Sequence, residues 1–197
     1  MGREPSPRPE YKAAGFSDDH HTTLLGAAYG LRHFRIDQDG WLVGLTYRTR
    51  WANGPTQAEC YNPRRGAVKS AGEYRPATPG PEDRSHSMLE CGCGLWAYFG
   101  VGLSEWAVYG ASDTISLCGV VRMWGRSVIG TLGSRSLFAQ VVALQEPHRT
   151  QMKYPVFRDA YRRLLRNYSN IAWYESRADM LRAWPLSSHY RNPEAKE

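Results

Sequence analysis

Residues 115–145, ISLCGVVRMWGRSVIGTLGSRSLFAQVVALQ, decide the fold. Two apolar, β-prone runs occupy this stretch, and glycines inside the first run predict bulges or tight curvature. Gly133 and Ser134 fit a two-residue turn that starts with glycine, and such a turn sets the register. In that register Trp124 faces Ala143, a large side chain opposite a small one. The stretch predicts a strongly curved antiparallel hairpin in which Trp124 is buried.

A second hairpin is predicted upstream of this stretch. Residues 29–36 and 41–49 are extended runs, and the segment 37–40, Asp-Gln-Asp-Gly, separates them. Asp and Gly supply the backbone geometry that a tight turn needs. The sheet therefore begins well before residue 115.

The C-terminal third changes from strand to helix periodicity. Pro155 suits the first turn of a helix, and Ser176 suits the cap of a second helix over 177–184. Residues 171–174 form a short strand candidate between them. The first helix has an apolar face made of Phe157, Tyr161, Leu164, Leu165 and Tyr168. The predicted fold class is α+β, a curved antiparallel β-sheet core with short C-terminal helices.

Composition and charge exclude some classes of protein and leave others open. The 197 residues are 42% hydrophobic and hold no apolar run of the roughly 20 residues that a membrane-spanning helix needs. The first residues do not resemble a secretory signal, and four cysteines are too few for a disulfide scaffold, so a cytoplasmic protein with no membrane partner is expected. The net charge is +6, but 21 of the 25 basic residues are arginine, as GC-rich codon usage produces. This excess permits an anionic partner without requiring one.

The sharpest local motif is Cys91-Gly92-Cys93-Gly94. Two thiols one residue apart are poorly placed for a disulfide but can share one metal ion. Cys60 and His86 complete a Cys3His set, the number and type of ligands that zinc binds in a tetrahedron. Protein side chains would fill all four positions, so this zinc would be structural.

Other interpretations of the cysteines stay open. CxC is only moderately specific, and the alternative is four cysteines beside a coincidental histidine. Cys118 is an alternative fourth ligand, although its apolar strand favours a buried thiol that packs like a small hydrophobe. With the zinc site, the predicted organisation is a flexible N-terminal arm (1–22), a β-rich core with the zinc-tied loop (23–150), a helical extension (151–187) and a tail (188–197).

Residues 29–145 resemble a group of uncharacterised proteins of actinobacteria and their phages. The resemblance rests on a cysteine after a tryptophan-containing segment, a histidine before a Cys-x-Cys-Gly run, and the Gly-x-Val-x-x-Trp-Gly-Arg strand at 119–126. This chain departs from the group by a longer, more charged segment at 61–85. The resemblance implies a zinc-bound, β-rich module and nothing about activity.

Two basic regions are candidate binding surfaces. Arg158, Arg162 and Arg166 recur every four residues and share one side of the predicted helix, although Asp159 could pair with Arg163 and leave a merely solvated face. The second region is the proline-rich loop 61–84, in which aromatic and basic residues alternate. Its candidate partner-binding residues are Arg64, Arg65, Tyr74 and Arg75. Such a composition suits a protein hot spot and single-stranded nucleic acid equally well.

The sequence indicates binding rather than catalysis. It contains no Gly-rich phosphate loop, no HExxH and no GxSxG motif. We therefore expect a non-enzymatic, zinc-stabilised binding or adaptor protein of an actinobacterium or its phage that recognises a host or phage protein. The alternative is a nucleic-acid-binding protein that uses the loop 61–84 and the arginine-rich helix 156–168.

Overall fold

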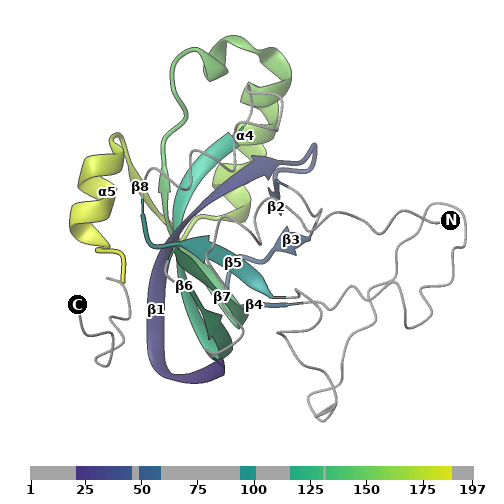
Figure 1. Cartoon of the computed structure of the whole chain (residues 1–197). Helices are drawn as coiled ribbons and strands as arrows, with labels where there is room; N and C mark the ends of the chain where they lie inside the picture. Colours follow the sequence, from purple (N-terminus) through teal and green to yellow (C-terminus); the bar gives the residue numbers. More distant parts are fainter. Residues whose placement is uncertain (1–20, 46–48, 59–93, 101–115, 131, 188–197) are drawn as a thin grey trace, which may run out of the picture.

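The computed structural model describes residues 21–45, 49–58, 94–100, 116–130 and 132–187 (Figure 1). Most of these residues belong to strands, and the helices follow them near the C-terminus, which confirms an α+β fold. The strands are β1 (His21–Ile36), β2 (Leu42–Gly44), β3 (Arg50–Trp51), β4 (Thr56–Gln57), β5 (Leu95–Tyr98), β6 (Ser116–Ile129), β7 (Gly133–Gln145) and β8 (Ala172–Tyr174). The helices are the 3-10 helix η2 (Gln151–Lys153) and the α-helices α4 (Pro155–Asn167) and α5 (Arg177–Ala183).

Three long strands form the centre of the sheet. β6 lies between β1 and β7 and pairs antiparallel with both. β5 pairs with β7 and also reaches β1, where Leu31 lies opposite Tyr98. The pairings therefore run in a closed circuit from β1 through β6, β7 and β5 back to β1, and apolar side chains from all four strands form one buried cluster. β8 pairs in parallel with the C-terminal end of β7.

The predicted turn at 37–40 is confirmed. β1 and β2 pair antiparallel on either side of it, with Ile36 opposite Leu42. The Asp37 carboxylate closes the turn by accepting hydrogen bonds from the backbone N–H groups of Asp39 (3.0 Å) and Trp41 (2.9 Å). Gly40 has a φ of +82°, in the region that favours glycine.

The central hairpin exists, but its predicted turn and register are wrong. Gly133 and Ser134 belong to β7, and the connection from β6 to β7 precedes them. Trp124 lies opposite Phe138 instead of Ala143. Gly133 was misread as a turn residue. The structure needs glycine there because β7 lies close to β5, and an added Cβ would lie 3.1 Å from the Cα of Tyr98.

Trp124 is half-buried, so the prediction of a buried ring is also wrong. The register of β6 against β7 shifts just after Trp124, and Gly125 within this irregularity has a φ of +79°. A second shift falls between Val120 and Val121. Both shifts confirm the bulges that the glycines of this strand predict.

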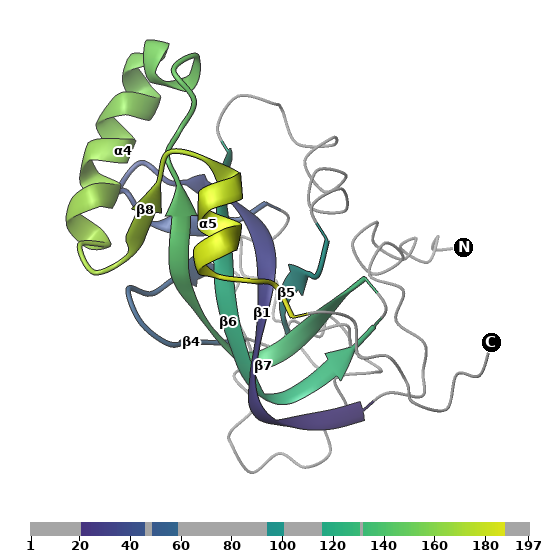
Figure 2. The same ribbon diagram turned by 90° about the vertical axis from the view of Figure 1, so that its left-hand side faces the viewer.

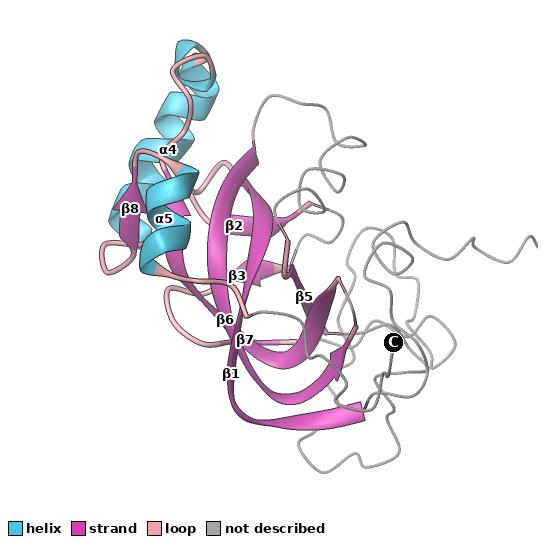
Figure 3. Ribbon diagram, turned by 60° about the vertical axis from the view of Figure 1, so that its left-hand side comes forward, coloured by secondary structure: helices cyan, strands magenta, loops and turns pink. Residues whose placement is uncertain are grey.

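The two α-helices cover different faces of the sheet. Phe157, Leu164 and Tyr168, from α4 and the residue that caps it, join the cluster that lines the closed circuit. On α5, Met180 packs against Leu31 and other residues of the opposite face. Figure 2 shows α5 in front of the long strands with α4 beside the sheet, and in Figure 3 these strands curve away from both helices.

Both helices begin as the sequence predicts. Pro155 is the first residue of α4, and the Ser176 side chain accepts a hydrogen bond from the Asp179 N–H (3.1 Å) at the start of α5. The apolar face of α4 needs one correction, because Leu165 is 40% exposed whereas its neighbour Leu164 is fully buried. Leu165 lies one residue, about 100°, beyond the buried side of the helix.

Candidate binding surface

The predicted zinc ligands Cys60, His86, Cys91 and Cys93 lie outside the described residues, as do Arg64, Arg65, Tyr74 and Arg75 of the predicted loop. Within the described ranges, no three His, Cys, Asp or Glu side chains form a group that could hold a metal ion. Cys118 is described, and its thiol is buried in an apolar cluster with Leu31, Val120 and Met180. This confirms the prediction that Cys118 packs as a core residue.

The predicted arginine stripe is described in full, and it lies in solvent. Arg158, Arg162 and Arg166 are all exposed on α4. Arg162 forms an ion pair with Asp159, with 3.1 Å between Nη1 and Oδ1. The predicted Asp159–Arg163 pair is wrong, because Arg163 donates a hydrogen bond to the Gln38 carbonyl oxygen (2.6 Å).

Two of these arginines keep their charge available. Neither the Arg158 nor the Arg166 side chain forms an ion pair or hydrogen bond with any residue that the structure describes. The ion pair of Arg162 is itself exposed, and such pairs contribute about 0–1 kcal/mol. An acidic partner could therefore displace Asp159 at small cost.

Exposed apolar side chains lie beside the arginines. The large hydrophobic residues of the described chain with exposed side chains are Tyr154 (51%), Val156 (79%) and Leu165 (40%), and all three belong to α4 or the residue before it. Arg158, Arg162 and Leu165 follow a spacing of four and three residues, which places them along one side of the helix, and Tyr154 is the residue before its first turn. We call Tyr154, Arg158, Arg162, Leu165 and Arg166 the α4 outer surface.

Sequence reasoning found the arginines of this surface and missed Tyr154, and it also missed the exposed Val156, which lies on another side of α4. A signal was present for Val156. It lies three residues before Asp159 and seven before Arg163, on polar positions of the helix, and an apolar residue there has no core to enter. Tyr154 precedes the helix, and its exposure could not be inferred from helical spacing.

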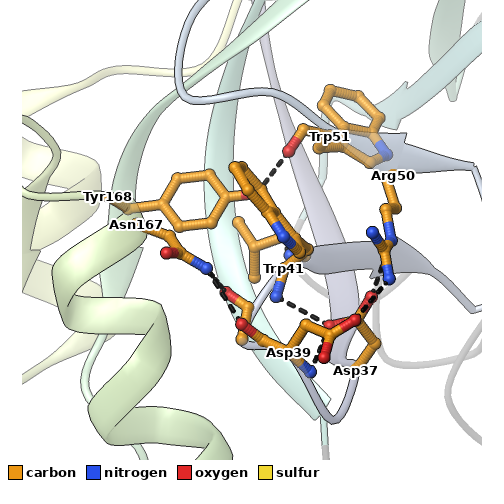
Figure 4. A network of polar contacts seen from close by, with 9 residues as sticks. Asp37, Asp39, Trp41, Arg50, Trp51, Asn167 and Tyr168 are labelled. Atoms are coloured by element: carbon orange, nitrogen blue, oxygen red, sulfur yellow. Dashed lines mark hydrogen bonds and ion pairs between the residues drawn. The ribbon is translucent and has the colours of Figure 1, made fainter.

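A polar network holds α4 against the β1–β2 turn (Figure 4). The Asn167 side-chain amide donates to the carbonyl oxygens of Asp39 (3.1 Å) and Gly40 (3.0 Å). The Tyr168 hydroxyl accepts from the Leu42 N–H (3.1 Å) and donates to the Trp51 carbonyl oxygen.

The turn itself is braced from the other side. The Arg50 guanidinium lies 2.9 Å from the Asp37 carboxylate and 2.8 Å from the Asp39 carboxylate. Three segments distant in sequence (the turn, β3 and the end of α4) are thereby joined, as Figure 4 shows. The α4 outer surface is presented on a helix whose buried side is fixed to the sheet.

Tyr168 makes this attachment sensitive to alkaline pH. Burial raises the pKa of its hydroxyl from 10.0 to about 12. The unfolded chain therefore releases this proton near pH 10, before the folded chain does. The stability that the Tyr168 hydroxyl contributes is fully present below pH 10 and is lost as the pH rises towards 12.

We expect Tyr168→Phe to lower the free energy of unfolding at neutral pH by about 1–3 kcal/mol, because the buried Leu42 N–H loses its partner. The same variant should lose less stability than the wild type between pH 10 and pH 12. Urea unfolding at a series of pH values measures both effects. Parallel losses in the two proteins would show that Tyr168 does not titrate as described.

Comparisons with family models, curated proteins and solved structures found no match to this chain. None of the described helices is long and apolar enough to cross a membrane.

Proposed function

We propose that this protein is a non-enzymatic binding protein that recognises an acidic surface of a protein partner through the α4 outer surface. One observation carries the proposal: the exposed large hydrophobic side chains of the described chain gather at α4, beside Arg158 and Arg166, whose side chains pair with no described residue. Interfaces between proteins are enriched in Tyr and Arg, and they combine apolar contacts with charge pairs at the rim. Carboxylates of the partner would complement Arg158 and Arg166, while its apolar side chains would cover Tyr154 and Leu165.

The anchoring of α4 supports the same proposal. A surface that is already held in place loses little conformational entropy when a partner binds. Tyr168 and Asn167 attach the buried side and the C-terminal end of the helix to the sheet, so that binding need only order the outer side chains.

A nucleic acid is the alternative partner for the same helix. Phosphates would pair with the arginines but would leave Tyr154 and Leu165 exposed to water. Binding to nucleic acid would also weaken steeply as salt rises, by about 0.7–0.9 log units per log unit of salt for each phosphate contact. The apolar residues favour the protein partner.

The test compares two synthetic peptides in a fluorescence binding assay. One is a helical peptide in which Glu and Leu alternate at helical spacing, and the other has Gln in place of each Leu. We expect the wild type to bind the Glu/Leu peptide more tightly. Arg158→Glu combined with Arg166→Glu should weaken that binding about tenfold or more and leave the thermal unfolding temperature nearly unchanged.

A matched double variant controls for net charge. Arg35 and Arg182 are exposed and lie on β1 and α5, so Arg35→Glu with Arg182→Glu changes the charge equally without touching α4. This control should bind the Glu/Leu peptide almost as the wild type does. Equal loss in both double variants, or equal affinity for the two peptides, would contradict the proposal.

We further propose that one structural zinc ion is bound by Cys60, His86, Cys91 and Cys93, on the evidence of the sequence motif alone. Elemental analysis of the purified protein should find about one zinc per chain. Cys91→Ser should abolish the metal, whereas Cys118→Ser should keep it because Cys118 is buried in the apolar core of β6. A folded wild-type protein without zinc would overturn this proposal.

A further inference from the structure

A second surface lies on β6, on the face of the sheet opposite to α4. Successive residues of a strand point to opposite faces, and Met123 belongs to the buried cluster that includes Phe157 of α4. Its neighbours Arg122 and Trp124 therefore point to the other face. They are accompanied there by residues directly opposite them on the adjacent strands, since antiparallel partners share a face. Arg122 lies opposite Tyr29 of β1 and Gln140 of β7, and Trp124 lies opposite Phe138.

All five of these side chains end in a flat group. The rings of Trp124 and Phe138 are stacked, with 6.0 Å between centroids and 16° between planes. The Arg122 guanidinium carbon lies 5.6 Å from the centroid of the Trp124 ring. Arg122 is exposed, and the other four residues are half-buried, so each keeps part of its side chain in solvent. We call Tyr29, Arg122, Trp124, Phe138 and Gln140 the aromatic platform.

The strands around the platform are positively charged. β1, β6 and β7 together contain five arginines and no Asp or Glu, and three of these arginines, Arg35, Arg122 and Arg126, are exposed. Arg122 forms no ion pair with a residue that the structure describes, and its guanidinium lies against the Trp124 ring. Strands without acidic residues and with exposed guanidinium groups attract an anion.

We propose that the aromatic platform binds single-stranded nucleic acid. Unpaired bases stack on aromatic rings and on arginine planes whatever their sequence, while a positive surface follows the phosphates. The platform supplies both, because Trp124 offers ring surface and Arg122 offers charge, whereas the Tyr29 ring packs against Trp184 at the end of α5, with 5.8 Å between centroids. The Gln140 amide beside them can donate to or accept from a base edge.

A protein partner suits the platform less well. The exposed large hydrophobic residues of the described chain lie at α4, whereas the platform rings are half-buried and one of them is overlaid by a guanidinium. Base stacking needs only an accessible ring surface, and it contributes about 1–3 kcal/mol per base. The platform and the α4 outer surface lie on opposite faces, so the two proposals stand independently.

The experiment measures binding of labelled oligo(dT) and oligo(U) by fluorescence anisotropy at low salt. We expect the wild type to bind both single strands, and Arg122→Gln to bind them at least about fivefold more weakly. Trp124→Leu should show a similar loss, since leucine keeps apolar packing on Phe138 but offers no ring. Circular dichroism checks the fold of each variant, and exposed Arg122 keeps the test valid should Trp124→Leu fail to fold.

The control is Arg35→Gln, which removes an exposed arginine from the same strand system but outside the platform. It should bind oligo(dT) within about twofold of the wild type, and the Arg158→Glu/Arg166→Glu variant should also retain that binding. Absence of wild-type binding, or equal loss in Arg35→Gln, would overturn the platform. Loss of Glu/Leu peptide binding in Arg122→Gln would instead assign the platform to a protein partner and would equally overturn the proposal.

Discussion

Gly40→Ala should lower the free energy of unfolding by about 3–5 kcal/mol. Gly40 has a φ of +82°, where a side chain strains the backbone. An added Cβ would also lie 2.6 Å from the Leu164 backbone nitrogen and would collide with the Cβ of Arg163. Neither neighbour can move without shifting α4, so the attachment of this helix to the β1–β2 turn should be lost. Urea unfolding followed by circular dichroism measures the change.

Gly54→Ala is the matched control for Gly40→Ala. Gly54 also has a positive φ, +150°, but an added Cβ there would meet nothing within 4 Å. The control therefore carries the backbone strain without the collision, and we expect a smaller loss, about 1–3 kcal/mol. Equal losses at the two positions would show that α4 does not press on the turn.

Leu164→Ala should be comparably damaging, with a loss of about 2–5 kcal/mol. Leu164 is fully buried and packs in the cluster that connects α4 to the four-strand circuit. Truncation to alanine removes apolar contacts and leaves a cavity that a well-packed core fills only in part. The same unfolding experiment gives the value.

The adjacent Leu165→Ala makes the same substitution at an exposed position of α4, so it separates the effect of burial on stability from the effect of helix propensity. Leu165 is 40% exposed, so its truncation should change the free energy of unfolding by no more than about 0.5 kcal/mol. It should nevertheless weaken binding of the Glu/Leu peptide, since Leu165 belongs to the α4 outer surface. A large stability loss at Leu165 together with a small one at Leu164 would reverse the assigned orientation of the helix.

Local signals predicted the elements well, because each depends on residues close in sequence. The turn at 37–40 needs only its own Asp and Gly, and the starts of α4 and α5 need only Pro155 and Ser176. The arginine stripe follows from helical spacing alone. The interaction of Asp159 with Arg162, in place of Arg163, shows the limit of this reasoning: Arg163 is taken by Gln38, which is distant in sequence.

Strand pairing between distant segments could not be predicted from the sequence. Gly133 has the properties of a turn residue, and local rules place the hairpin turn there. In the structure Gly133 lies within a strand, and the close approach of β5 requires glycine there. No residue near position 133 in the sequence indicates that β5 will pair at this point. The error in register then misplaced Trp124, whose true neighbour is Phe138. An error in the register of one strand against the other changes which residues are assigned to the surface and which to the core.

By itself the sequence determined the α+β class, the curvature of the central strands, the turn at 37–40, the helix starts and the exposed arginine stripe. Each of these follows from backbone geometry or side-chain periodicity within a few residues. The tertiary structure alone decided the closed circuit of strands, the attachment of α4 through Tyr168 and Asn167, and the assembly of the aromatic platform from β1, β6 and β7. The residues that meet in these features are distant in sequence, in some cases by more than a hundred positions. Packing selects which of them become partners, and packing acts only once the chain has folded.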